Sequence, residues 1–308
     1  MIHVIEVNGL TKRYGDVLAV NDLSFTVRPG TVTGFLGPNG AGKSTTLRMI
    51  LGLNRPTAGT ATIDGRPFPQ RQAGLHHVGA LLDAGDVHPG RSAAAHLSAL
   101  ARTNGLPHRR VREVLEEVGL AGAARRRVGG FSLGMRQRLG IATALLGDPP
   151  VLLFDEPVNG LDPEGVRWVR GLFKGLAAEG RTVLVSSHLM SEMENTADRL
   201  VVIGRGELIA EESVDEFAAR GTRSRTHVTV RTPDPARLSA VLTPEGAGVQ
   251  PDGQETLTVT GLTADRIGEL AFEHRIMLRE LAPHSASLEE AFMELTTGRA
   301  EYLAGDRR

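Results

Sequence analysis

Residues 32–50 read VTGFLGPNGAGKSTTLRMI, and this stretch decides the fold. Its first five residues form a short apolar run typical of a buried strand, and LRMI continues a helical pattern. Between strand and helix the sequence fits G-x-x-x-x-G-K-[ST]. Such a loop presents backbone N–H groups to an anion, and the helix start adds the positive end of its dipole. The stretch therefore predicts a phosphate-binding loop made of Gly37, Pro38, Asn39, Gly40, Ala41, Gly42, Lys43, Ser44 and Thr45.

Within this loop two side chains have expected roles. Lys43 should reach the outer phosphates of a nucleotide, and the hydroxyl of Ser44 should hold Mg²⁺. The alternative is a glycine-rich turn that happens to contain a lysine, but the strand before it and the helix after it favour the phosphate loop.

Strand-like and helical segments alternate after the loop. VLLFDEP at 151–157 and TVLVSSH at 182–188 are short apolar runs, a helical pattern at 163–179 separates them, and RLVVIG follows at 199–204. This alternation predicts an α/β fold with a P-loop NTPase core, in which helices cover both faces of a parallel sheet.

Other segments indicate additional substructures. Strand-like patterns at 2–7 and 23–27 belong to an expected antiparallel β subdomain, and residues 84–146 read as a helical insertion rich in Ala, Leu, Arg and Glu. The composition changes near 221–225, after which alternating strands and the amphipathic helices 264–274 and 287–297 predict a small α+β domain. We therefore expect one domain at 1–220 and a second at 226–308.

The bulk composition excludes several classes of protein. The 308 residues carry a net charge of −1, so no strong field would draw in nucleic acid or an anionic membrane. The absence of cysteine excludes disulfides and cysteine-ligated metals and fits a reducing cytosol. We recognise no signal peptide and no apolar run near the ~20 residues that a membrane-spanning helix needs.

Two carboxylates follow the apolar run VLLF. Asp155 stands at the end of the expected strand, where it can support Mg²⁺ through water. Glu156 comes next, where a carboxylate can orient and deprotonate an attacking water. A solvated acidic turn is the alternative, and the phosphate loop argues against it.

Two further side chains are candidates for contact with a nucleotide. His188 follows the apolar run TVLVSS, so it should emerge at the carboxyl edge of the sheet and contact the terminal phosphate, although a lone histidine can also be structural. Tyr14, in TKRYGDVLAV, is expected in a polar turn, where it could stack on a base or be an ordinary exposed tyrosine.

Residues 131–140, FSLGMRQRLG, open a second helix whose start suits phosphate. Ser132 is a good N-cap, and Gly134 has no side chain to keep a phosphate from the backbone N–H groups. The chain thus carries, in order, the Tyr14 segment, the phosphate loop, this helix start, VLLFDEP, the segment NGLDP at 159–163 that contains Asp162, and SSH. This order resembles that of the ATP-binding subunits of ABC transporters over roughly residues 2–220.

The resemblance implies how the second helix start is used. FSLGM occupies the place of the family signature, usually LSGGQ, which binds the nucleotide held by the other subunit of a head-to-tail dimer. Leu133 and Met135 depart from that signature and resemble the variant found in drug and antibiotic exporters of the bacitracin-resistance type. The resemblance places Asp162 in the segment that connects the two ATP sites of the dimer, each of which is built from both subunits.

A third departure concerns Asp83. The resemblance places a glutamine near VGALLDAG, where it contacts magnesium and relays to the membrane subunit, and Asp83 stands there instead. An aspartate could also bind magnesium, or it could lie in a solvated loop facing the permease.

As a whole, the resemblance implies a homodimeric ATPase that uses ATP and Mg²⁺. It would drive export of a small hydrophobic or drug-like substrate through a separate membrane permease, and it would bind that permease at the cytoplasmic face of the membrane. The C-terminal part, ending SLEEAFMELT, resembles the accessory domain of such subunits.

Two alternatives come from other functional classes. A non-transport ABC ATPase acting on ribosomes or DNA usually has two cassettes with a basic linker, coiled coils or zinc sites, and this sequence has none of these. An importer subunit is the other alternative, and FSLGM argues against it.

Overall fold

A computed structural model describes residues 3–68, 74–225, 227–284 and 292 of the chain. The chain divides into two compact units, and the division falls between Val214 and Asp215. Residues 221–225, where the composition changes, belong to helix α7 (Val214–Arg225).

The phosphate loop joins the central strand of a six-stranded sheet to a helix. The sheet has the order β5 (Val78–Leu81), β6 (Val151–Phe154), β7 (Thr182–Ser187), β3 (Val32–Leu36), β8 (Arg199–Gly204) and β9 (Glu207–Ser213). The first five strands are parallel, which confirms the predicted fold class, and β9 pairs antiparallel with β8. Every residue of β3, β6 and β7 is buried, as expected for strands covered on both faces.

A second, antiparallel sheet covers one face of the first. It has the order β2 (Val17–Val27), β1 (Ile5–Tyr14) and β4 (Ala58–Ile63). A single apolar core joins the two sheets, and within it the rings of Phe25 and Phe35 stack with their centroids 5.4 Å apart. The antiparallel β subdomain predicted from the sequence is therefore present, with β1 and β2 longer than the predicted segments.

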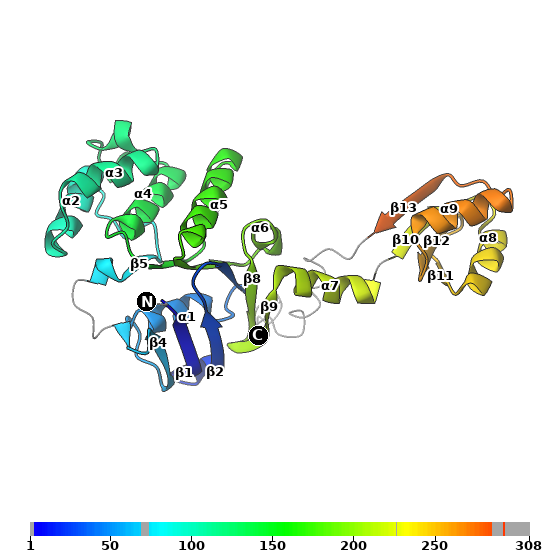
Figure 1. The fold of residues 1–308 in the computed structure, drawn as a ribbon, viewed down its shortest axis with the longest axis horizontal. Coiled ribbons are helices and arrows are strands. Elements are labelled where there is room, and N and C mark those ends of the chain that lie inside the picture. Colours follow the sequence, from blue (N-terminus) through cyan, green and yellow to red (C-terminus); the bar gives the residue numbers. More distant parts are fainter. Residues whose placement is uncertain (1–2, 69–73, 226, 285–291, 293–308) are drawn as a thin grey trace, which may run out of the picture. The chain divides into compact units, whose positions relative to one another are not determined.

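Helices complete this unit. They are α1 (Lys43–Ile50), α2 (Ala93–Thr103), α3 (Arg109–Glu117), α4 (Leu133–Leu145), α5 (Pro163–Ala178) and α6 (Met190–Glu194), with 3-10 turns at Gly74–His76, Ala121–Ala123 and Val128–Gly130. Helices α2 to α5 lie on the side of the six-stranded sheet opposite the β1, β2 and β4 sheet (Figure 1). Serine side chains cap α2 and α4, and Asp162 caps α5, so the sequence itself sets where these helices begin.

The second unit has its own antiparallel sheet and core. After α7 come β10 (His227–Arg231), α8 (Pro235–Leu242), a 3-10 turn (Thr243–Glu245), β11 (Gly248–Pro251), β12 (Thr256–Thr260), α9 (Ala264–Glu273) and β13 (Glu280–His284), with strand order β11-β12-β10-β13. Val230 and Val259 of the sheet pack in one core with Leu238 and Ile267 of the helices. The predicted α+β fold is observed, while the predicted helix at 287–297 lies outside the described residues except for position 292.

Within the described residues, no helix is both long enough and apolar enough to cross a bilayer.

Candidate active site

The glycine-rich loop lies between β3 and α1 and lines a cavity of about 250 Å³. Gly42 stands at the N-cap of α1 with a φ of +102°, and a Cβ there would lie 2.6 Å from the carbonyl oxygen of Ala19. Only glycine fits such a position. The first N–H groups of a helix lack intrahelical partners, and no side chain caps α1. The loop thus offers backbone donors and a helix dipole to an anion.

Lys43 is a buried cation that lines this cavity. Its side chain is 6% exposed, and Nζ donates to the carbonyl oxygen of Gly37 at 2.6 Å and lies 3.6 Å from Oε1 of Glu156. Burial lowers the pKa of Lys43, while the carboxylates of Glu156 and Asp155 act in the opposite direction. The ammonium is therefore held beside the predicted base.

Glu156 links the phosphate loop to His188. Its carboxylate lines the same cavity as residues 39–45, and Oε2 lies 2.9 Å from Nδ1 of His188. The structure thus gathers Lys43, Ser44, Glu156 and His188 at the carboxyl ends of β3, β6 and β7, where the parallel sheet predicts them. Their catalytic roles remain predictions.

The backbone of Glu156 adopts an unusual conformation. Its φ is +48°, in the left-handed region, which for a residue other than glycine costs on the order of 1–3 kcal/mol. Its N–H donates to Oγ of Ser186 at 2.9 Å, and its carbonyl oxygen accepts from Nε2 of Gln137 at 3.1 Å. Neither Ser186 nor Gln137 was predicted from the sequence, although a polar residue within an apolar strand or on a buried helix face is a signal that could have indicated them.

The segment after β7 is held by a second carboxylate, Glu192. Ser187 donates a short hydrogen bond to Oε2 of Glu192, and Oγ of Ser187 accepts the N–H of Leu189 at 3.0 Å. Burial raises the pKa of Glu192, the bond from Ser187 opposes that rise, and the nearby Glu156 adds to it. These contacts fix the turn that carries His188.

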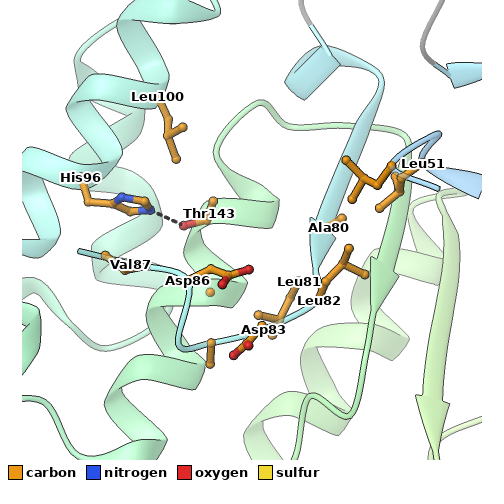
Figure 2. Close-up of a pocket in the computed structure, with 13 residues that line it drawn as sticks. Leu51, Ala80, Leu81, Leu82, Asp83, Asp86, Val87, His96, Leu100 and Thr143 are labelled. Carbon is orange, nitrogen blue, oxygen red and sulfur yellow. Dashed lines mark hydrogen bonds between the residues drawn. The ribbon is translucent and has the colours of Figure 1, made fainter. Parts of the chain in front are cut away.

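Asp83 lies at the junction of two cavities. With Asp155 and Glu156 it lines one cavity of about 280 Å³. It also lines a groove of about 330 Å³, together with apolar residues of β5 and of the helical insertion. Figure 2 shows Asp83 and Asp86 in this groove, with His96 beside Thr143 across from them. Oδ1 of Asp83 accepts the N–H of Gly85 at 2.7 Å, which shapes the loop after β5.

The expected partner-facing residues lie elsewhere. Ser132 is exposed and caps α4 by accepting the N–H of Met135 at 3.2 Å, and Gly134 lies in the first turn of that helix. Neither residue lines the cavity of the phosphate loop. Asp162 accepts the N–H of Gly165 at 2.8 Å, so it has a local role as the cap of α5.

Tyr14 is the last residue of β1 and is 47% exposed. Its hydroxyl accepts Nδ2 of Asn54 at 2.8 Å, and Nζ of Lys12 lies 4.8 Å from the ring centroid. The ring is thus placed at a strand end rather than within the turn, and it does not line the phosphate-loop cavity.

The residues present fit a magnesium nucleotide. No group of three or more His, Asp or Glu side chains able to hold a metal by themselves occurs among the described residues. Ser44 lines the loop cavity, and Asp155 accepts a short hydrogen bond from Ser186 through Oδ1. A hydroxyl and a carboxylate are ligands suited to Mg²⁺ that also binds substrate phosphates, rather than to an all-protein metal cage.

A parallel sheet with this loop, a buried lysine and a glutamate at its carboxyl edge defines a P-loop nucleotide-binding protein. Residues 20–159 match the ABC transporter family, and residues 226–289 match a domain family of unknown function. An uncharacterized ABC transporter ATP-binding protein of Bacillus subtilis is 37% identical over 301 residues, which cover 95% of this chain and 96% of the relative. The chain therefore belongs to the ABC transporter ATP-binding proteins, and it is an ATPase.

Two further comparisons bear on its function. A bacitracin transport ATP-binding protein of Bacillus licheniformis is 41% identical over 226 residues, covering 72% of this chain and 74% of the relative. The dimeric structure of a bacterial ABC transporter cassette matches with a TM-score of 0.63 at 25% identity, over 68% of this chain and 98% of that chain.

Proposed function

We propose that this chain is the ATP-hydrolysing subunit of an exporter for small hydrophobic or drug-like compounds. It would act as a homodimer on a separate permease, at the cytoplasmic face of the membrane. The position of Glu156 between Lys43 and His188 at the phosphate-loop cavity carries the hydrolysis of ATP. The 41% identity to a bacitracin transport ATP-binding protein supports export. We assign the ATP-binding cassette to residues 1–220 and the accessory domain to residues 226–308.

In the proposed reaction the loop N–H groups, the start of α1 and Lys43 bind the phosphates of ATP. Ser44 and Asp155 would hold Mg²⁺, which supplies positive charge to the phosphoryl oxygens. Glu156 accepts a proton from the water that attacks the terminal phosphorus, while the bond from that phosphorus to the bridging oxygen breaks and ADP leaves. His188, whose Nδ1 lies 2.9 Å from Glu156, steadies that carboxylate and contacts the terminal phosphate.

The site would be completed by a second copy of the chain. Ser132 and Gly134 form an exposed helix start that lies outside the loop cavity of their own chain. A helix start is suited to bind phosphate. The match to a dimeric cassette structure supports a head-to-tail pair in which this helix start faces the partner's ATP, with Asp162 in the connecting segment.

The groove in Figure 2 is our candidate for contact with the permease. Its walls are largely apolar, and Asp83 belongs both to this groove and to the cavity of Asp155 and Glu156. A permease segment seated there would touch a residue that also faces the catalytic carboxylates.

Asp83→Asn is expected to raise the magnesium concentration needed for half-maximal hydrolysis roughly several-fold, because a hard cation prefers a carboxylate to an amide oxygen. The amide oxygen can still accept the N–H of Gly85, so the loop should keep its shape. Hydrolysis would be titrated with magnesium, with and without the permease.

Asp86→Asn is the matched control, because Asp86 lines the groove but not the cavity of Asp155. Its magnesium curve should coincide with that of the parent protein. An unchanged magnesium curve for Asp83→Asn, together with weaker stimulation by the permease, would assign Asp83 to permease contact instead of the metal.

Export itself can be tested in inside-out vesicles that contain this chain and its partner permease. ATP should drive accumulation of bacitracin or of a hydrophobic cationic dye in the lumen, and Glu156→Gln should abolish it. ATP-driven transport in the opposite direction would favour an importer. Hydrolysis stimulated by ribosomes or DNA rather than by the membrane protein would favour a non-transport ATPase.

A further inference from the structure

Glu156 is held in its left-handed conformation by side chains from two different elements. Its N–H and its carbonyl flank the Cα whose φ is +48°. Ser186 of β7 accepts the N–H, and Gln137 of α4 donates to the carbonyl oxygen. The backbone N–H of Asn159 donates to the same carbonyl oxygen at 3.3 Å. A strained backbone conformation persists only where surrounding contacts hold it in place. Here hydrogen bonds hold the peptide groups on both sides of the Cα of Glu156.

Both side chains are buried. Ser186 is fully buried and Gln137 is 5% exposed, so each polar group is costly without a partner. Ser186 also donates to Oδ1 of Asp155, and this bond orients its oxygen toward the N–H of Glu156. Apart from the amide of Gln137, the buried side of α4 is formed by apolar residues and glycine, namely Leu139, Gly140, Ile141, Ala142, Ala144 and Leu145.

The first turns of α4 lie against the loop that begins at Glu156. A Cβ on Gly134 would lie 3.2 Å from the carbonyl oxygen of Gly160, and Gln137, three residues further on, reaches Glu156. Residues three apart share one face of a helix. This face of α4 therefore contacts the loop at two points, and the polar contact is at the proposed base.

We propose that Gln137, together with Ser186, is a positioning residue that holds the peptide groups of Glu156 so that its carboxylate faces Lys43 and His188. This inference rests on the proposed role of Glu156 as the base. Without the bond from Gln137, the carbonyl of Glu156 loses its side-chain donor. The backbone then turns toward the commoner right-handed conformation, which moves the carboxylate away from its two partners.

The first test replaces Gln137 with methionine, which keeps the length of the side chain and removes the donor. We expect kcat for ATP to fall by about 10- to 100-fold, the scale for a misplaced catalytic group. ATP affinity of the full chain, measured with a fluorescent ATP analogue, should stay within about twofold, because Gln137 does not line the phosphate-loop cavity. Thermal unfolding would confirm that the variant is folded.

Arg138→Met is the matched control. Arg138 is the next residue of α4, and it likewise donates one hydrogen bond to a backbone carbonyl, that of Val118 at 3.0 Å. If Gln137 acts only by stabilising α4, both variants should lose activity alike. If Gln137 positions Glu156, the Arg138 variant should retain its kcat.

Gln137→Glu adds a readout that a merely structural role would not move. A protonated carboxyl can donate to the carbonyl of Glu156, whereas a carboxylate cannot, and burial raises the pKa of such a group. The ratio of kcat for Gln137→Glu to that for Gln137→Met should therefore rise as the pH is lowered from about 8 to about 6. Should the methionine variant unfold, the ratio of kcat for Gln137→Glu to that of the parent protein takes its place and should likewise rise as the pH is lowered.

Three outcomes would overturn the inference: a parental kcat in Gln137→Met, equal losses in Gln137→Met and Arg138→Met, or a pH-independent ratio. Failure of the proposed function appears differently, as unchanged turnover in Glu156→Gln. If Glu156→Gln is inactive and Gln137→Met is fully active, the positioning role is rejected and the proposed function stands.

Discussion

Glu156→Gln is expected to lower ATP turnover by ~10² or more, the scale of lost general-base help. The amide keeps the shape of the side chain and can still contact Lys43 and His188, but it cannot take a proton from water. ATP should remain bound, because the loop donors and Lys43 are unchanged. Single-turnover hydrolysis and equilibrium binding of ATP would separate the two effects.

Glu164→Gln is a suitable control, because Glu164 is an exposed acidic residue in the first turn of α5, away from the loop cavity. It should hydrolyse ATP at the parental rate. Turnover in Glu156→Gln at the level of this control would exclude Glu156 as the base.

Ser132→Arg is expected to abolish hydrolysis in the dimer while each chain still binds ATP. Ser132 is exposed at the start of α4 and does not line its own loop cavity. In the proposed dimer the arginine would therefore obstruct only the partner's phosphate. When a Ser132→Arg chain pairs with a Lys43→Ala chain, one of the two ATP sites keeps an intact Lys43 from the first chain and an intact Ser132 from the second. Heterodimers isolated through two different tags should recover up to about half of the parental activity, as two-fold symmetry requires.

Ser132→Ala controls for the lost helix cap, which costs about 1 kcal/mol of stability. It adds no bulk, so it should retain most of the activity that the arginine removes. Inactive heterodimers, isolated with both tags, would contradict a site shared between two chains.

The sequence predicted those parts of the site that are local in the chain. The loop from Gly37 to Thr45 and the pair Asp155-Glu156 each follow an apolar strand, and parallel strands bring their carboxyl ends to one edge. Contacts between distant segments were not predictable in this way. Gln137 lies 19 positions before Glu156 in the sequence, and Ser186 lies 30 positions after it. Neither hydrogen bond leaves a periodic pattern in the sequence.

Other differences have equally physical causes. Strand β9, ELIAEES, was not predicted because it is a polar strand at the edge of the sheet, where an apolar run is not required. Tyr14 ends β1 instead of lying in a turn, because β1 and β2 continue pairing up to Tyr14 and Val17. The two-residue connection after Tyr14 is too short to show as a loop in composition.

Gly160 and Leu133 form a pair whose substitutions should be coupled. Gly160 has a φ of +75°, which by itself disfavours any side chain there, and a Cβ on it would lie 2.2 Å from Cδ2 of Leu133. Leu133 itself stands where the family signature usually has glycine. Because Leu133 is exposed, its side chain can turn away from a new Cβ, whereas the strain of the positive φ would remain. The effects of substitutions at the two positions on the free energy of unfolding should therefore not be additive.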